Sequence, residues 1–274
     1  MLDLLLDGQL IATERNYEKD LFSYWKAHNF YKLSPPDISI KFSAESVSLE
    51  GIFVAGYQSA LHALFPDKDW QGWSSFLFSE QPNENVGMLP TTLKRDGLVY
   101  ILSGSKSWVA HSEYAGRLIV TLKPGNDNPQ HSGGVIITGD KDIGVSINHH
   151  NSVKMLSNIS QGWAIFDRVK VEDTQFFEKS LIREFQKVES NYMILSILSF
   201  LVSKKFSSGK KPEHNLKSLC QDYYWYLKKP GSRSSEKLST LRDRVKECIL
   251  ENIEDNVAFT EDWDKDKRLF YMYL

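Results

Sequence analysis

Residues 91–110 read TTLKRDGLVYILSGSKSWVA, and this stretch decides the fold of the middle of the chain. Two β-type runs, Thr91–Lys94 and Leu98–Leu102, lie on either side of Arg95, Asp96 and Gly97. An Asp-Gly pair between two such runs is a strong hairpin signal, because glycine readily adopts the left-handed backbone conformation that tight hairpin turns require. The stretch therefore predicts a pair of antiparallel strands.

Short apolar runs continue on both sides of this hairpin. They lie at Phe76–Phe78, Leu118–Leu122, Val135–Thr138, Val145–Ile147 and Ala164–Val171. With the hairpin they make about seven strands at regular spacing, which is typical of an antiparallel barrel or sandwich. We expect an antiparallel β-barrel over residues 76–172.

The segment before this β region has a helical pattern. Its apolar residues recur with a 3.6-residue period at Phe53, Val54, Tyr57, Ala60, Leu61 and Leu64. Pro66 ends that helix, because its ring cannot be accommodated against the preceding turn. Ser34–Asp37, which contains two prolines, predicts a loop. Residues 1–75 are therefore expected to form a short N-terminal helical domain.

The segment after the β region is helical as well. Tyr192–Val202 is apolar on nearly all sides and predicts a buried core helix, and a second helix is expected at Asn215–Leu227. A third begins at Ser234 or Ser235, with an inward stripe at Leu238, Leu241, Val245 and Ile249. The fold class is therefore α+β, with a C-terminal helical bundle at residues 173–274.

Composition excludes several classes of partner. The 33 basic and 35 acidic residues give a net charge of −2, so there is no electrostatic reason to expect nucleic acid or an anionic membrane as partner. Two cysteines do not make a disulfide framework, which favours a cytoplasmic protein. Tyr192–Val202 is too short to cross a bilayer, and the first residues lack the features of a signal peptide. The adjacent His149 and His150 are interpreted as loop residues, and no metal is expected.

Four blocks of sequence resemble, in order, the middle domain of acyl-CoA dehydrogenases: Phe76–Glu80, Thr91–Gly97, Tyr100–Ala110 and Ala164–Val171. That family has an aromatic-rich strand, a Thr-Thr strand with an Arg-Asp-Gly turn, a Gly-x-Lys turn before an aromatic residue, and a closing strand with an acidic-x-Val-x-Val ending. Several collinear blocks are more specific than one short motif. The resemblance implies an FAD-dependent oxidoreductase that performs α,β-oxidation of an acyl thioester, carried on CoA or on a carrier protein, in a homo-oligomer.

The resemblance also implies which residues form the site. The flavin contacts would come from Phe76, Phe78, Ser79, Asn85, Trp108 and Ala110. Among these, Trp108 would stack on the flavin ring, and Ser79 keeps a hydroxyl that the family supplies there. Glu189, at the start of the last helical domain, is the candidate base for the substrate's α-proton.

The chain also departs from the family pattern. Ala110 lies where the family has a threonine hydroxyl, and the loop Glu80–Val86 contains no glycine. Three hypotheses therefore stay open: an acyl-thioester dehydrogenase, a catalytically inactive homologue acting as a binding or assembly module, and a flavin enzyme with other chemistry. The alternative interpretation of Trp108 is an aromatic residue of the barrel, and that of Glu189 is an acid at a helix terminus.

Overall fold

The structure is a computed structural model, and it describes residues 1–10, 12, 17–67, 70–79, 90–123, 129, 132–138, 143–150, 156–229, 235–254, 271 and 273. The chain divides into two compact units. We call Met1–Asp69, Lys154–Leu156 and Lys187–Leu274 the helical unit, and Trp70–Val153 and Ser157–Gln186 the β unit. The division into three domains stays a prediction.

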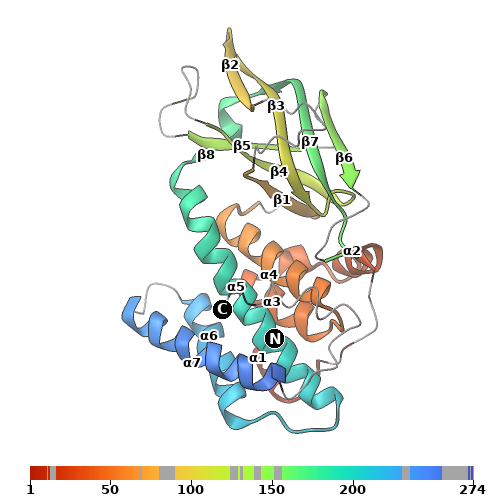
Figure 1. The fold of residues 1–274 in the computed structure, drawn as a ribbon, viewed down its shortest axis with the longest axis vertical. Coiled ribbons are helices and arrows are strands. Elements are labelled where there is room, and N and C mark those ends of the chain that lie inside the picture. The colour runs from red at the N-terminus through yellow and green to blue at the C-terminus, as the bar shows by residue number, and fades with distance from the viewer. Residues whose placement is uncertain are drawn as a thin grey trace. The chain divides into compact units, whose positions relative to one another are not determined.

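The β unit contains two four-stranded sheets, in the orders β1-β4-β5-β8 and β2-β3-β7-β6 (Figure 1). The strands are β1 (Trp73–Leu77), β2 (Thr92–Asp96), β3 (Val99–Ala110), β4 (Ala115–Thr121), β5 (Ser132–Thr138), β6 (Val145–His150), β7 (Gln161–Val171) and β8 (Phe176–Glu178). Alternate apolar side chains from both sheets form one core, which includes Leu77, Leu102, Leu118, Val135 and Phe166. The two sheets therefore share a single hydrophobic interior.

The hairpin prediction is confirmed. Strands β2 and β3 pair in antiparallel register from Thr92↔Ser103 to Asp96↔Val99. Gly97, in the turn, has a φ of 64°, a conformation that an L side chain rarely adopts. The Asp-Gly signal thus identified the turn correctly.

The barrel prediction is wrong. Neither four-stranded sheet closes on itself, and β1 pairs with β4 in parallel. The strand spacing could not reveal this, because period-2 alternation is the same for barrel and open sheets, and the β1–β4 pairing joins strands separated by a hairpin. What is confirmed is the mixed helix-and-strand composition, with seven α-helices and eight strands in the described part of the chain.

The helical unit begins with α1 (Leu2–Leu6), α2 (Glu18–Ala27), α3 (Pro35–Ala44) and α4 (Leu49–Leu64). The end of α4 before Pro66 agrees with the sequence prediction. The loop predicted at Ser34–Asp37 is wrong, because Ser34 is the N-cap of α3 and the two prolines lie in its first turn. Proline is accepted there because the first N–H groups of a helix have no intrahelical partner.

The later helices are α5 (Ser180–Ser207), α6 (His214–Lys228) and α7 (Ser235–Glu254). All three occur where apolar periodicity predicts helices. In α7, Leu241, Val245 and Ile249 are buried, as the stripe requires. Helix α5 is longer than the predicted apolar run. A more polar segment of the same helix precedes the buried segment Tyr192–Val202.

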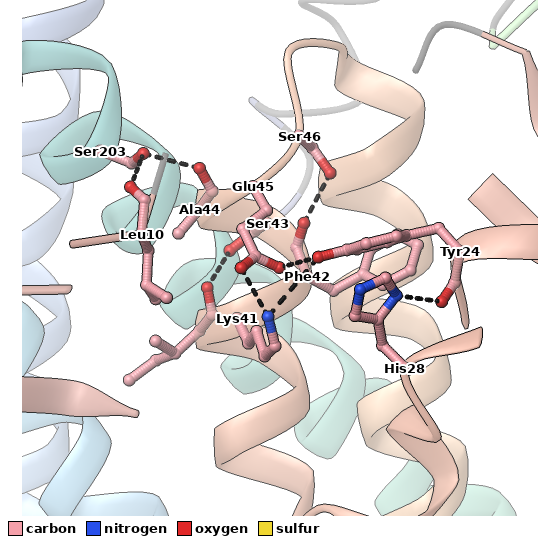
Figure 2. A network of polar contacts seen from close by, with 11 residues as sticks. Leu10, Tyr24, His28, Lys41, Phe42, Ser43, Ala44, Glu45, Ser46 and Ser203 are labelled. Carbon is pink, nitrogen blue, oxygen red and sulfur yellow. Dashed lines mark hydrogen bonds and ion pairs between the residues drawn. The ribbon is translucent and has the colours of Figure 1, made fainter. Parts of the chain in front are cut away.

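Polar contacts join the early and late helices within the helical unit (Figure 2). The buried Ser203 hydroxyl of α5 lies 3.1 Å from the Leu10 carbonyl oxygen and 2.6 Å from that of Ala44. Beside it, Glu45 accepts hydrogen bonds from Tyr24 and Lys41. Segments far apart in sequence therefore fold together in this unit.

Candidate functional site

A β-bulge in β3 determines the direction of the Trp108 side chain. Lys106 pairs with Ala164 of β7 and Val109 with Gly162, so two residues of β3, Ser107 and Trp108, lie opposite one residue of β7. Such an insertion changes the direction of a side chain at that point of the strand. The Trp108 side chain is 40% exposed, whereas both Lys106 and Val109 are buried.

The Trp108 ring is held at its edge. Its Nε1 donates to Oε1 of Gln161, the first residue of β7, at 3.0 Å. The N–H is the only polar group of the indole ring, so this hydrogen bond fixes the orientation of the ring and leaves its face free for stacking. A flat aromatic ligand would therefore contact a pre-oriented indole.

Phe78 and Ser79 lie next to this bulge. They follow the end of β1, and the Ser107 amide donates to the Ser79 carbonyl oxygen at 2.9 Å. Phe78 is 63% exposed. The backbone of Phe78 and Ser79 thus lies beside the bulge that contains Trp108, and the sequence had singled out these three residues. We call this group, with Lys106 and Gln161, the bulge cluster.

The other proposed flavin contacts are Phe76, Ala110 and Asn85. The Phe76 side chain is buried and stacks on Phe185, with ring centroids 4.1 Å apart. Ala110 is buried at the end of β3 and pairs with Gln161. Asn85 lies outside the described residues. The roles of these three residues in binding a flavin stay predictions.

Sequence reasoning missed Lys106. It is 1% exposed, and its Nζ lies 3.1 Å from Oγ1 of Thr121 in β4 and 3.4 Å from the Phe78 carbonyl oxygen. The Thr121 hydroxyl in turn donates to the Leu77 carbonyl oxygen at 3.1 Å. This lysine therefore joins the end of β1 to β3 and β4. A signal did exist, since Lys106 is the only charged residue of β3.

We expect Lys106→Met to loosen the bulge cluster without unfolding the β unit. A buried amine is costly to desolvate, so an apolar side chain of similar length is expected to keep the free energy of unfolding within about 1 kcal/mol. Loss of the bond to the Phe78 carbonyl should speed hydrogen exchange at the Ser107 amide by about tenfold, the equivalent of one hydrogen bond. Lys170→Met, at an exposed position of β7, is the control. Unchanged exchange at Ser107 would contradict this role.

Glu189 lies in α5, in the helical unit. Its Oε1 accepts a hydrogen bond from the Tyr273 hydroxyl at 2.9 Å. Burial raises the pKa of Glu189 from an ordinary value of 4.5 to about 7, although the Tyr273 hydrogen bond acts in the opposite direction. A carboxyl group with a pKa near neutrality can both accept and release a proton at physiological pH.

The next two residues of α5 also bind side chains from other helices. Ser190 accepts a hydrogen bond from Arg242 of α7. Asn191 accepts one from the Tyr223 hydroxyl of α6 at 2.9 Å. Glu189, Ser190 and Asn191 therefore form, with their partners, a polar cluster within the helical unit. We call it the α5 polar cluster.

The histidine pair does not lie in a loop, so that interpretation is wrong. His149 and His150 are the last residues of β6, and His149 Nδ1 lies 2.9 Å from the Ser112 hydroxyl. Within the described ranges, no group of three His, Cys, Asp or Glu side chains is placed to hold a metal ion. Cys220 is buried, which raises its pKa to about 12. No helix in the described part of the chain is long and apolar enough to cross a membrane.

Comparison with known proteins shows similarity of structure. No family model and no curated protein matches the sequence. An FAD-dependent dehydrogenase is 13% identical over 94% of this chain and 85% of its own, with a TM-score of 0.62. The prolyl acyl carrier protein oxidase AnaB is 12% identical over 94% and 86%, with a TM-score of 0.61. Butyryl-CoA dehydrogenase from Megasphaera elsdenii is 11% identical over 96% and 87%, with a TM-score of 0.59.

Identities this low show the fold alone. The chain therefore has the fold of FAD-dependent, acyl-CoA dehydrogenase-like proteins, and the resemblance drawn from the sequence is confirmed at the level of the fold.

Proposed function

We propose that this protein is an acyl-CoA dehydrogenase-like flavoprotein, which binds FAD through the bulge cluster and oxidises an acyl thioester with Glu189 as base. The observation that carries the proposal is the bulge that leaves Trp108 exposed and is hydrogen-bonded, through the Ser107 amide, to the Ser79 carbonyl oxygen. Both of the strand regions joined by this bond carry residues to which the sequence resemblance assigns flavin contacts. Both the fold and the local geometry support this assignment.

The residues of the bulge cluster fit an isoalloxazine ring. Trp108 offers an indole face whose orientation is fixed by Gln161, and the exposed Phe78 adds a second aromatic side chain. Ser79 adds a hydroxyl and backbone groups for the polar edge of the ring. FAD, when bound, supplies the acceptor for the hydride that leaves the substrate's β-carbon.

Glu189 supplies the acid–base chemistry in this proposal. At pH 7 a large fraction of its carboxyl groups is ionised, because its pKa is about 7. The carboxylate takes the proton from the α-carbon of the thioester, and the C–H electron pair forms the new α,β double bond as the hydride departs. The similar solved structures include a prolyl acyl carrier protein oxidase and a butyryl-CoA dehydrogenase, so a carrier-bound acyl group and an acyl-CoA are both proposed as substrates.

One observation favours a second candidate function, an inactive homologue that keeps the fold as a binding module. Ala110 is a buried methyl group where the family resemblance calls for a hydroxyl. Mixing the FAD-loaded protein anaerobically with panels of acyl-CoA and acyl-carrier thioesters separates the two candidates. The proposal expects loss of the flavin's visible colour with at least one of them. An FAD-loaded protein that no thioester bleaches would support the inactive homologue.

Trp108→Ala is expected to weaken FAD binding by about 5- to 150-fold, because stacking on an aromatic side chain contributes ~1–3 kcal/mol. Fluorescence titration with FAD measures the dissociation constant. Trp225→Ala is a matched control, since Trp225 of α6 is also 40% exposed but is not part of the bulge cluster. Equal affinities of the two variants would exclude Trp108 as a stacking residue.

A further inference from the structure

Tyr273 is bound to α5 at two points. Its hydroxyl donates to Oε1 of Glu189 at 2.9 Å. Its backbone carbonyl oxygen accepts a hydrogen bond from the Ser190 hydroxyl at 3.3 Å. Both the backbone and the tip of this tyrosine are therefore held against two consecutive residues of one helix, although more than 80 positions separate them in sequence.

The titratable and charged groups near this contact come from several elements. Arg242 of α7 donates to the Ser190 hydroxyl, and Tyr223 of α6 donates to the neighbouring Asn191. Tyr57 of α4 and the Glu189 carboxylate both raise the pKa of Tyr273, after burial as the main cause. Tyr273 therefore stays protonated at physiological pH and remains a hydrogen-bond donor. Among the described side chains, its hydroxyl is the one that hydrogen-bonds the Glu189 carboxylate.

We propose that Tyr273 is a positioning residue for Glu189: it holds Oε1, so that Oε2 is the oxygen that receives the substrate's α-proton. This inference rests on the proposed function of Glu189 as the base. A carboxylate with one oxygen bound loses rotational freedom about its last bond, and its second oxygen then has a defined direction. Protonation of Oε2 leaves the lone pairs of Oε1 in place, so the Tyr273 bond persists through the proton transfer.

Ser190 and Arg242 hold the backbone of Tyr273 in place. The Ser190 hydroxyl donates to the Tyr273 backbone and accepts from Arg242, so it fixes the tyrosine independently of the phenol group. Replacing the tyrosine by phenylalanine therefore removes the contact with Glu189 and keeps the backbone anchor. This makes Tyr273→Phe a selective test.

The experiment compares Tyr273→Phe with Tyr271→Phe, whose ring is 48% exposed. Two quantities are measured over a pH range: the infrared absorption of the Glu189 carboxyl group, identified by its loss in Glu189→Gln, and the rate at which a saturating acyl thioester bleaches bound FAD. Tyr273→Phe is expected to raise the apparent pKa of Glu189 by about one unit, since a hydrogen bond to the charged form is lost. It is expected to slow bleaching about tenfold with unchanged FAD affinity.

The outcomes separate this inference from the proposed function. If Tyr273→Phe matches Tyr271→Phe in both measurements while the wild-type protein is bleached, Tyr273 does not position the base and the proposed function stands. If the FAD-loaded wild-type protein is never bleached, the proposed function fails, and the positioning role fails with it. A pKa shift together with slower bleaching, absent from Tyr271→Phe, supports the inference.

Discussion

Glu189→Gln is expected to slow flavin bleaching by a saturating acyl thioester by about 10²- to 10⁴-fold, the usual contribution of a general base. Glutamine keeps the shape of the side chain and an oxygen that can accept from Tyr273, but it cannot take a proton at neutral pH. FAD affinity is expected to stay unchanged, because Glu189 is not among the residues proposed to contact the flavin. Stopped-flow absorbance under anaerobic conditions measures the rate.

The matched control is Glu184→Gln, an exposed glutamate of the same helix. It should bleach at the wild-type rate. If Glu189→Gln bleaches as fast as Glu184→Gln, another residue is the base, and the pKa of Glu189 then reflects only its burial.

The same substitution is expected to stabilise the protein above pH 7. Burial holds the pKa of Glu189 at about 7 in the folded state, against an ordinary value of 4.5. The folded state therefore binds the proton more tightly than the unfolded state, and the wild-type protein loses stability as the pH rises from 4.5 towards 7. At ~1.4 kcal/mol per pKa unit this loss amounts to about 3 kcal/mol and persists at higher pH. Glutamine, which stays neutral, avoids it.

Urea unfolding of the wild-type protein and of Glu189→Gln at a series of pH values measures this effect. The free energies of unfolding should be similar below pH 4.5, where the glutamate is protonated in both states, and should diverge by up to about 3 kcal/mol at pH 8. Glu184→Gln should show no such divergence. A pH-independent difference, or a variant less stable than wild type at pH 8, would contradict the raised pKa of Glu189 in the folded state. Stability lost at a functional residue is a common cost of function.

The sequence predicted helices and strands correctly where the contacts that determine them join residues close together in the chain. The apolar period of Phe53–Leu64 identified α4, and the Asp96-Gly97 pair identified the β2–β3 hairpin. In both cases the determining contacts lie within one turn or one hairpin. The two prolines at Pro35 and Pro36 were misread as a loop, because proline breaks a helix interior but is favoured in its first turn.

Long-range pairing could not be predicted in the same way. The barrel prediction was wrong because the partner of β1 is the parallel strand β4. The alternation of apolar and polar residues along a strand does not indicate which other strand it pairs with. Strand β8, Phe176–Glu178, was missed because a three-residue strand carries no pattern of its own.

For the candidate site, the sequence named residues but not the contacts between them. Phe78, Ser79 and Trp108 were singled out by the order of the sequence blocks, and their roles stay predictions; the structure adds the hydrogen bond between Ser79 and Ser107 of the bulge. The sequence did not indicate the contacts that hold the bulge cluster and the α5 polar cluster. Lys106 reaches the Phe78 carbonyl across 28 positions, and Tyr273 reaches Glu189 across 84. Such contacts depend on tertiary packing, which neither composition nor periodicity encodes.

Titration of the flavin-free protein with FAD tests the central claim most directly. The account predicts that the visible absorption bands of the flavin sharpen and shift with one FAD per chain, that Trp108 fluorescence is quenched in parallel, and that Trp108→Ala weakens both changes while Trp225→Ala does not. A protein whose flavin spectrum and tryptophan fluorescence remain those of the separate components at every FAD concentration would contradict it.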